Sequence, residues 1–167
     1  YAMGNWTFMD FPDDFSATYM NKWGTFRWSG DDLSTRDHYY AYGLLTKFLR
    51  GSSATLRTEV DDPYIRVAAL EYEGTGARSI AIVNRYAGDV PVSIELGDGA
   101  NGQVFRKYVY DPERVPQSPF GDLQGPERTV TVRDGKLDDR LGRGTLTVYT
   151  TAYDNDPPAA VAGLRVE

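Results

Sequence analysis

The stretch STRDHYYAYGLLTKFLRGSSATLRTEV, residues 34–60, contains the point where the chain changes from helix-forming to strand-forming sequence. Its first part predicts an amphipathic helix over residues 34–50, because Tyr40, Leu44 and Phe48 recur at a spacing of four and form one apolar stripe. Such a stripe needs a partner surface to cover it. The sequence that follows predicts what that surface is.

The ends of this helix are also marked in the sequence. Ser34 is placed to cap the N-terminus, with Asp37 three residues on, where a capping box has its carboxylate. Lys47 and Arg50 suit the negative end of the helix dipole, and Gly51 is a natural residue just past the C-terminus. These signals predict a helix that begins after Ser34 and ends before Gly51.

From about residue 54 to residue 153 the pattern predicts strands. Seven segments are rich in β-branched and aromatic residues, many of them alternate, and turn-forming sequence separates them with no helix between. This spacing indicates an antiparallel sandwich or barrel, and we expect a sandwich. The segments are ATLRTEV, YIRVAALEYE, RSIAIVNRY, VPVSIELG, GQVFRKYVY, RTVTVRDGKL and GTLTVYTTAY.

Composition excludes several functional classes. The 167 residues carry a net charge of −6 with a pI near 4.8, which argues against binding to nucleic acid or to an anionic membrane. The chain has no cysteine, so it forms neither disulfides nor thiolate metal sites. Its apolar runs fall short of the roughly 20 residues of a membrane helix. We therefore expect no nucleic-acid partner, no membrane partner and no cofactor.

The segment NWTFMDFPDD, residues 5–14, reads like the end of a buried strand that runs into an acidic loop. With the 34–50 helix it forms one βα unit, which cannot bury both faces of its strand without further partners. This is the layout of the last βα unit of a (β/α)8 barrel followed by a C-terminal β-sandwich. The predicted fold class is mainly β, an antiparallel sandwich preceded by one βα unit, and we expect the chain to be a fragment.

The residues of this segment resemble a known family. WTFMDFPDD is similar to the segment after the eighth barrel strand in glycoside hydrolases of clan A, most closely family 39, the β-xylosidase and α-L-iduronidase family. TVRDGKLDDRLGRGTLTVYTT, residues 131–151, resembles the closing sandwich strands of several clan A families. The family 39 pattern is approximately Trp-Thr-Phe-Ser-Asp-x-Phe-Glu-Glu. Trp6, Thr7, Phe8 and Asp10 match it in place, whereas Met9, Pro12, Asp13 and Asp14 depart from it.

The resemblance implies a domain organisation and a role. Residues 1–52 would be the last strand, loop and helix of a barrel, and residues 53–153 a C-terminal β-sandwich. Residues 154–167 would be a linker and the start of a fibronectin type III module, which often trails secreted bacterial glycosidases. The parent would be an extracellular retaining glycosidase whose acid and nucleophile are Glu residues upstream, so we expect no catalytic residue here. Its partners would be a carbohydrate substrate and an upstream catalytic barrel, in the same protein or in a second chain.

Four residues are candidates for substrate binding: Trp6, Asp10, Asp13 and Asp14. Active sites of such barrels lie at the C-terminal ends of the strands, where a Trp face stacks on a sugar and carboxylates accept hydrogen bonds from hydroxyls. Each has an alternative. Trp6 can be a core aromatic, Asp10 can hold the loop through backbone N–H groups, and Asp13 with Asp14 can form a solvated turn.

Other conspicuous residues favour structural roles. His38 is the single histidine, which argues against a metal or triad role. Trp23 and Trp28 can extend a sugar-binding surface, although packing between barrel and sandwich is favoured. The acidic segments SGDD and YDNDPP do not have the EF-hand spacing and read as turns.

Two other functions stay open. The chain can be a free-standing carbohydrate-binding β-sandwich module, but that leaves the βα unit of residues 1–51 without a role. It can also be part of an inactive relative of the hydrolases, since Asp replaces Glu at positions 13 and 14.

Overall fold

A computed structural model describes residues 11–12, 20–21, 25–26, 35–115 and 122–153 of the chain. One α-helix, a short 3-10 turn and ten strands lie in this part. Two of the strands are short and pair with each other near the start of the chain, whereas the others follow the helix. The elements are β1 Phe11–Pro12, β2 Met20–Asn21, α1 Asp37–Phe48, β3 Ser53–Leu56, β4 Ile65–Tyr72, β5 Arg78–Asn84, β6 Val90–Glu95, η1 Asp98–Ala100, β7 Val104–Tyr110, β8 Arg128–Thr131, β9 Lys136–Leu141 and β10 Leu146–Thr150.

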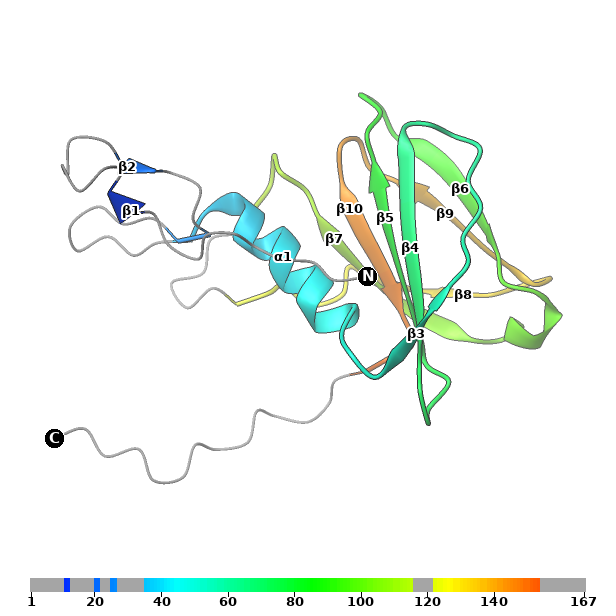
Figure 1. Ribbon diagram of the computed structural model, residues 1–167. Coiled ribbons are helices and arrows are strands. Elements are labelled where there is room, and N and C mark those ends of the chain that lie inside the picture. Colours follow the sequence, from blue (N-terminus) through cyan, green and yellow to red (C-terminus); the bar gives the residue numbers. More distant parts are fainter. Residues whose placement is uncertain (1–10, 13–19, 22–24, 27–34, 116–121, 154–167) are drawn as a thin grey trace, which may run out of the picture.

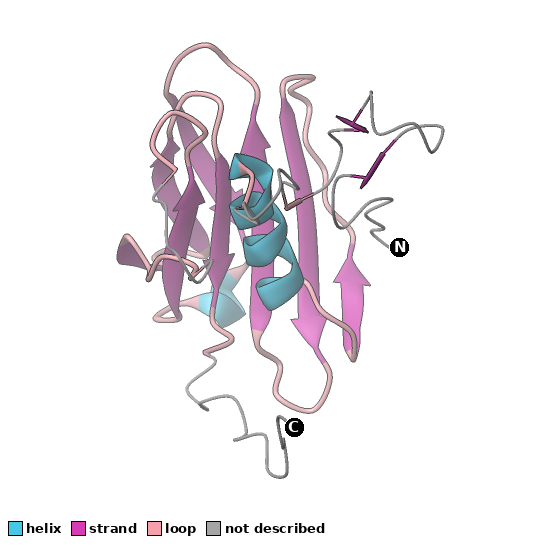
Figure 2. Ribbon diagram, turned by 90° about the vertical axis from the view of Figure 1, so that its left-hand side faces the viewer, coloured by secondary structure: helices cyan, strands magenta, loops and turns pink. Residues whose placement is uncertain are grey.

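The strands after the helix form two antiparallel sheets. The larger sheet has six strands in the order β3-β4-β5-β10-β7-β8, and β6 pairs with β9 in a separate two-stranded sheet. In Figure 1 the pair β6 and β9 lies on one side of the large sheet and α1 on the other. Figure 2 shows α1 lying over the face of the large sheet, roughly along its strands. The predicted fold class, mainly β with an antiparallel sandwich, is confirmed, and α1 precedes the sandwich as expected. The strand expected before this helix in one βα unit, within residues 5–14, lies largely outside the described residues.

The core between the two sheets follows from alternation along the strands. Ile80 and Ile82 of β5 point to the inner face together with Phe105 of β7, and they meet Leu137 and Leu141 of β9. All five side chains are buried. Because successive strand residues face opposite sides, Ala81 between the two isoleucines belongs to the other face of the sheet.

That other face is covered by α1. Its buried residues are Tyr40, Leu44 and Phe48, the stripe that the sequence predicts. The ring of Phe48 lies 4.5 Å from the ring of Tyr108 on β7. The hydroxyl of Tyr72 donates a hydrogen bond of 2.6 Å to the Phe48 carbonyl at the end of the helix. The predicted packing of the helix against the sheet is confirmed for Leu44 and Phe48, and Tyr40 is buried as expected.

The predicted ends of the helix are wrong. The helix begins at Asp37, its N-cap is Arg36, and no side chain caps it. Thr35 pairs with Phe26 in an isolated antiparallel bridge, and this extended backbone delays the start of the helix. At the other end the C-cap is Leu49, so Gly51 is not the residue just past the cap.

The predicted number of strands is also wrong, because RTVTVRDGKL is not one strand. It contains β8, a turn and the start of β9, so the described region after the helix has eight strands. Asp134 and Gly135 both have positive φ, 50° and 71°, as the two central residues of a type I′ turn do. Arg133 and Lys136 exchange backbone hydrogen bonds of 2.9 and 2.8 Å across it. The predicted loop RLGRG accordingly begins inside β9.

Replacing Phe48 by alanine tests how far the fold depends on the helix. Phe48 is 2% exposed, so Phe48→Ala leaves a cavity under α1 and is expected to lower the free energy of unfolding by about 3–5 kcal/mol. Urea denaturation followed by circular dichroism measures this change. Thr46→Ala, on the exposed side of the same helix, is the matched control and should leave the midpoint nearly unchanged. Equal midpoints for both variants would contradict the role of this contact.

Candidate functional site

The predicted substrate-binding residues Trp6, Asp10, Asp13 and Asp14 lie outside the described residues. Their roles stay predictions. The same holds for Trp23 and Trp28.

His38 lies in the first turn of α1 and is half-buried. Its ring stacks edge-on against Tyr42, with ring centroids 6.4 Å apart. Within the described part of the chain, no group of three or more His, Asp or Glu residues is placed to hold a metal ion. None of the helices in that part is long and apolar enough to cross a membrane.

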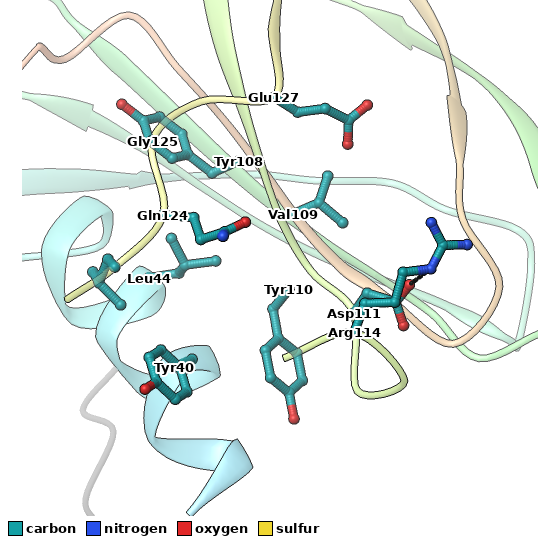
Figure 3. A pocket seen from close by; sticks show the side chains of 11 residues that line it. Tyr40, Leu44, Tyr108, Val109, Tyr110, Asp111, Arg114, Gln124, Gly125 and Glu127 are labelled. Atoms are coloured by element: carbon teal, nitrogen blue, oxygen red, sulfur yellow. Dashed lines mark ion pairs between the residues drawn. The ribbon is translucent and has the colours of Figure 1, made fainter. Parts of the chain in front are cut away.

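Two hollows lie beside the C-terminal end of β7. The first has a volume of about 230 Å³ and opens between α1, β7 and residues 122–127 (Figure 3). Figure 3 shows the rings of Tyr40 and Tyr110 at one end and Glu127 at the other. Burial raises the pKa of Tyr110, and the carboxylates of Asp37 and Asp111 raise it further, so its hydroxyl stays protonated. The tyrosine rings make this hollow aromatic, and their hydroxyls together with the amide of Gln124 make it polar.

The second hollow has a volume of about 430 Å³ and is strongly charged. It shares residues with the first, including Val109 and Glu127, so the two adjoin. Its lining comes from the end of β7, the start of β8, and the loops after β5 and β9. The charged residues of the lining are Asp89, Lys107, Asp111, Glu113, Arg114, Glu127, Arg128, Arg140 and Arg143.

The carboxylates that both hollows share are paired with cations. Asp111 lies 3.5 Å from the Arg114 guanidinium and accepts the Glu113 backbone N–H at 2.9 Å, which makes it a turn residue. Glu127 lies 3.8 Å from the ammonium group of Lys107. General acid catalysis in a glycosidase needs a carboxyl held neutral in an apolar enclosure. Asp111 and Glu127 are instead held in ion pairs.

A fully buried carboxylate belongs to Asp139 of β9, whose side chain is 0% exposed. It accepts a hydrogen bond of 2.8 Å from the Tyr149 hydroxyl and forms ion pairs with Arg128 and, at 3.1 Å, with Lys107. Lys107 also donates to the Arg140 carbonyl at 3.0 Å.

The same burial affects the protonation of two partners of Asp139. Burial lowers the pKa of Lys107, and Glu127 offsets part of this effect. Burial also raises the pKa of Tyr149.

Sequence reasoning did not identify Asp139, although a signal for its burial is present. It lies between Leu137 and Leu141 at a spacing of two, so alternation along a strand places all three side chains on the core face. The sequence prediction placed RLGRG in a loop and so did not recognise this strand. The partners of Asp139 come from three other strands and have no local signal.

Comparison with known proteins relates this fold to sugar-cleaving enzymes. No protein-family profile and no curated protein sequence matches the chain. Solved structures do match. A family 30 subfamily 8 xylanase from Clostridium acetobutylicum has a TM-score of 0.60 and 15% identity over 76% of this chain and 30% of its own. A thermostable family 51 α-L-arabinofuranosidase from Thermotoga petrophila has a TM-score of 0.60 and 17% identity, over 79% of this chain and 32% of its own.

The chain therefore shares its fold with part of these glycoside hydrolases. A family 30 endoxylanase from Clostridium papyrosolvens also matches, with a TM-score of 0.56 and 19% identity over 70% of this chain. The chain spans about 28–32% of the length of these three proteins. They belong to families 30 and 51, so the expected likeness to clan A is supported at the level of fold, and family 39 stays a prediction.

Removing the Asp139 carboxylate tests whether the buried cluster stabilises the fold. Asp139→Ala removes the nearest carboxylate from the buried Lys107 and is expected to lower the free energy of unfolding by about 3–5 kcal/mol. The adjacent Asp138 is exposed, so Asp138→Ala is the matched control and should change little. Thermal denaturation at neutral pH measures both. A similar loss in the two variants would mean that the cluster is not stabilising.

The raised pKa of Tyr149 predicts a loss of stability at high pH. The folded chain keeps this proton above about pH 10, where an unfolded tyrosine ionises. The contribution of the protonated Tyr149 to the free energy of unfolding is therefore complete below about pH 10 and is lost as the pH rises above it. Between about pH 9 and about pH 12 the unfolding free energy of the Tyr149→Phe variant should fall less steeply than that of the unchanged chain. The two slopes should differ by up to about 1.4 kcal/mol per pH unit above pH 10. Urea midpoints across this range test it, and parallel curves would contradict it.

Proposed function

We propose that this chain is the C-terminal portion of a secreted glycoside hydrolase. It contributes a substrate-binding rim and a structural β-sandwich to the hydrolysis of O-glycosidic bonds. The observation that carries the proposal is the fold likeness to a xylanase and an arabinofuranosidase, at a TM-score of 0.60 over about three quarters of the chain. The resemblance of the sequence of residues 6–14 to clan A hydrolases supports the proposal independently.

The proposed division of the chain places residues 1–52 in the end of a (β/α)8 barrel and residues 53–153 in the sandwich. The helix α1 would join the two parts, because it buries Leu44 and Phe48 against the large sheet. A helix in that position can connect a barrel rigidly to the sandwich. The barrel itself would be supplied by upstream sequence or by a second chain, and residues 154–167 would lead to a further module.

The proposed substrate is a polysaccharide rich in pentose sugars. The similar proteins named as xylanases and arabinofuranosidase act on such material, and family 39 contains β-xylosidases. Trp6 would offer a flat apolar face to one sugar ring. Asp10, Asp13 and Asp14 would accept hydrogen bonds from sugar hydroxyls.

The proposed mechanism is that of a retaining glycosidase, with the acid and the nucleophile about 5 Å apart on the barrel. In this chain the carboxylates of the two hollows are paired with cations, and Asp139 is fully enclosed by its partners. These pairings support a binding and structural role for the chain, with the chemistry carried out by the barrel.

Activity measurements test the proposal. The isolated chain is expected to have no turnover on aryl xylosides and aryl arabinofuranosides, whereas a longer chain with the upstream sequence should be active. In that longer protein Trp6→Ala should lower kcat/KM by roughly 10- to 100-fold, because it loses a stacking face. Trp6→Phe, which keeps an aromatic face, is the matched control and should lose less.

Turnover by the isolated chain would contradict the proposal if it disappeared in an Asp13→Asn, Asp14→Asn double variant. An inactive longer chain with intact fold would favour the alternative of an inactive hydrolase relative.

A further inference from the structure

An aromatic pair lies at the end of the large sheet where β4 begins and β5 ends. Tyr64 immediately precedes β4, and its side chain is among the large apolar ones exposed to solvent, at 51%. Tyr86 follows β5, and its ring centroid lies 4.9 Å from that of Tyr64, with the planes inclined by 44°. Neither residue lines either of the two hollows. Two tyrosine rings thus form one small exposed apolar surface.

Hydrogen bonds hold this surface in place. The Tyr86 hydroxyl donates to one carboxylate oxygen of Asp62 at 2.9 Å, and the other oxygen accepts the Tyr64 backbone N–H at 2.8 Å. The Arg85 N–H donates to the Tyr64 carbonyl at 3.0 Å, and the Tyr86 N–H donates to the Asn84 side chain at 2.9 Å. The Tyr86 ring is held through its hydroxyl, and the Tyr64 ring packs against it from a hydrogen-bonded backbone, so a ligand would find both rings already positioned.

A second exposed tyrosine, Tyr153, differs from Tyr64 because a cation covers its ring face. Tyr153 is 41% exposed, but the guanidinium of Arg106 lies 3.9 Å from its ring centroid. Its hydroxyl donates to the Val104 carbonyl at 2.7 Å. Tyr153 is thus used to pack the edge of the sheet, whereas the neighbour of Tyr64 is another aromatic ring that enlarges the apolar surface.

The chemistry of this surface suits a neutral sugar. An exposed tyrosine face packs against the C–H side of a pyranose ring. Each oxygen of Asp62 accepts one protein hydrogen bond and has a further lone pair for a sugar hydroxyl. The carboxylates of Asp61 and Asp62 and the net charge of −6 disfavour an anionic polysaccharide.

We propose that Tyr64, Tyr86 and Asp62 form a surface binding site for one or two sugar rings of a neutral polysaccharide chain. The site needs no catalytic group. It would hold the polymer on the sandwich, and it operates whether or not the chain belongs to an active hydrolase.

Binding to the full 167-residue chain tests this site. We expect xylohexaose or cellohexaose to shift the amide NMR signals of residues 61–64 and 85–87, with a dissociation constant on the order of millimolar. Tyr64→Ala should weaken binding by about tenfold or more, and Tyr64→Trp, which keeps a flat ring, should retain it. Tyr153→Ala is the matched control for loss of an exposed tyrosine and should leave binding unchanged.

Several results would overturn the proposal: no signal shift with either neutral oligosaccharide, binding that survives in Tyr64→Ala, or an equal loss in Tyr153→Ala. Binding of polygalacturonate in place of the neutral sugars would overturn it as well. If Tyr64→Ala does not fold, the shift map of the unchanged chain and the Tyr64→Trp variant still decide the matter. Because no turnover is measured, failure here is distinguishable from failure of the proposed hydrolase function.

Discussion

The buried carboxylate of Asp139 is the constraint on which the arrangement of the two sheets depends. Removing an ion from water costs several kcal/mol, and the cost is offset only when its partners are in place. Those partners are Lys107 on β7, Arg128 on β8 and Tyr149 on β10, all in the six-stranded sheet, whereas Asp139 lies on β9 in the other sheet. A different alignment of β9 against the large sheet would leave a charge in the core without a partner. The cluster therefore favours one packing of the sandwich over the alternatives that an apolar interface alone would allow.

The large sheet is covered on both faces, and this explains why the helix belongs to the same folding unit as the strands. Ile80 and Ile82 of β5 face the two-stranded sheet, while Ala81 between them lies under α1 with Val148 of β10. Without the helix, Ala81 and Val148 would be exposed to water, at a cost of about 25 cal/mol for each Å² of apolar surface. The helix thus acts as the third layer of the structure (Figure 1). The solved structures of larger glycoside hydrolases share this fold over about three quarters of the chain.

The carboxylates of Asp62, Asp111 and Glu127 each have a partner within the chain. The carboxylates of the two hollows are paired with lysine and arginine, and Asp62 holds a tyrosine pair in place. Pairing of this kind positions side chains for binding, whereas acid catalysis needs a carboxyl kept neutral by an apolar environment. These pairings fit the role proposed for the chain, which is to support and to hold a polysaccharide. The tyrosine pair and the proposed rim at residues 6–14 would then serve the same polymer at separate places on the chain.

The sequence by itself determined the class of the fold, because both of its signals are local. The spacing of Tyr40, Leu44 and Phe48 identifies the buried side of the helix, and alternation along the later segments identifies strands. The tertiary structure alone decided the start of the helix, where Phe26 pairs with Thr35, and the placing of β8 and β9 in different sheets. It also brought together Asp139 with Lys107, and Tyr64 with Tyr86. The physical reason is the same in each case: these arrangements depend on burial and on three-dimensional geometry that no local pattern records.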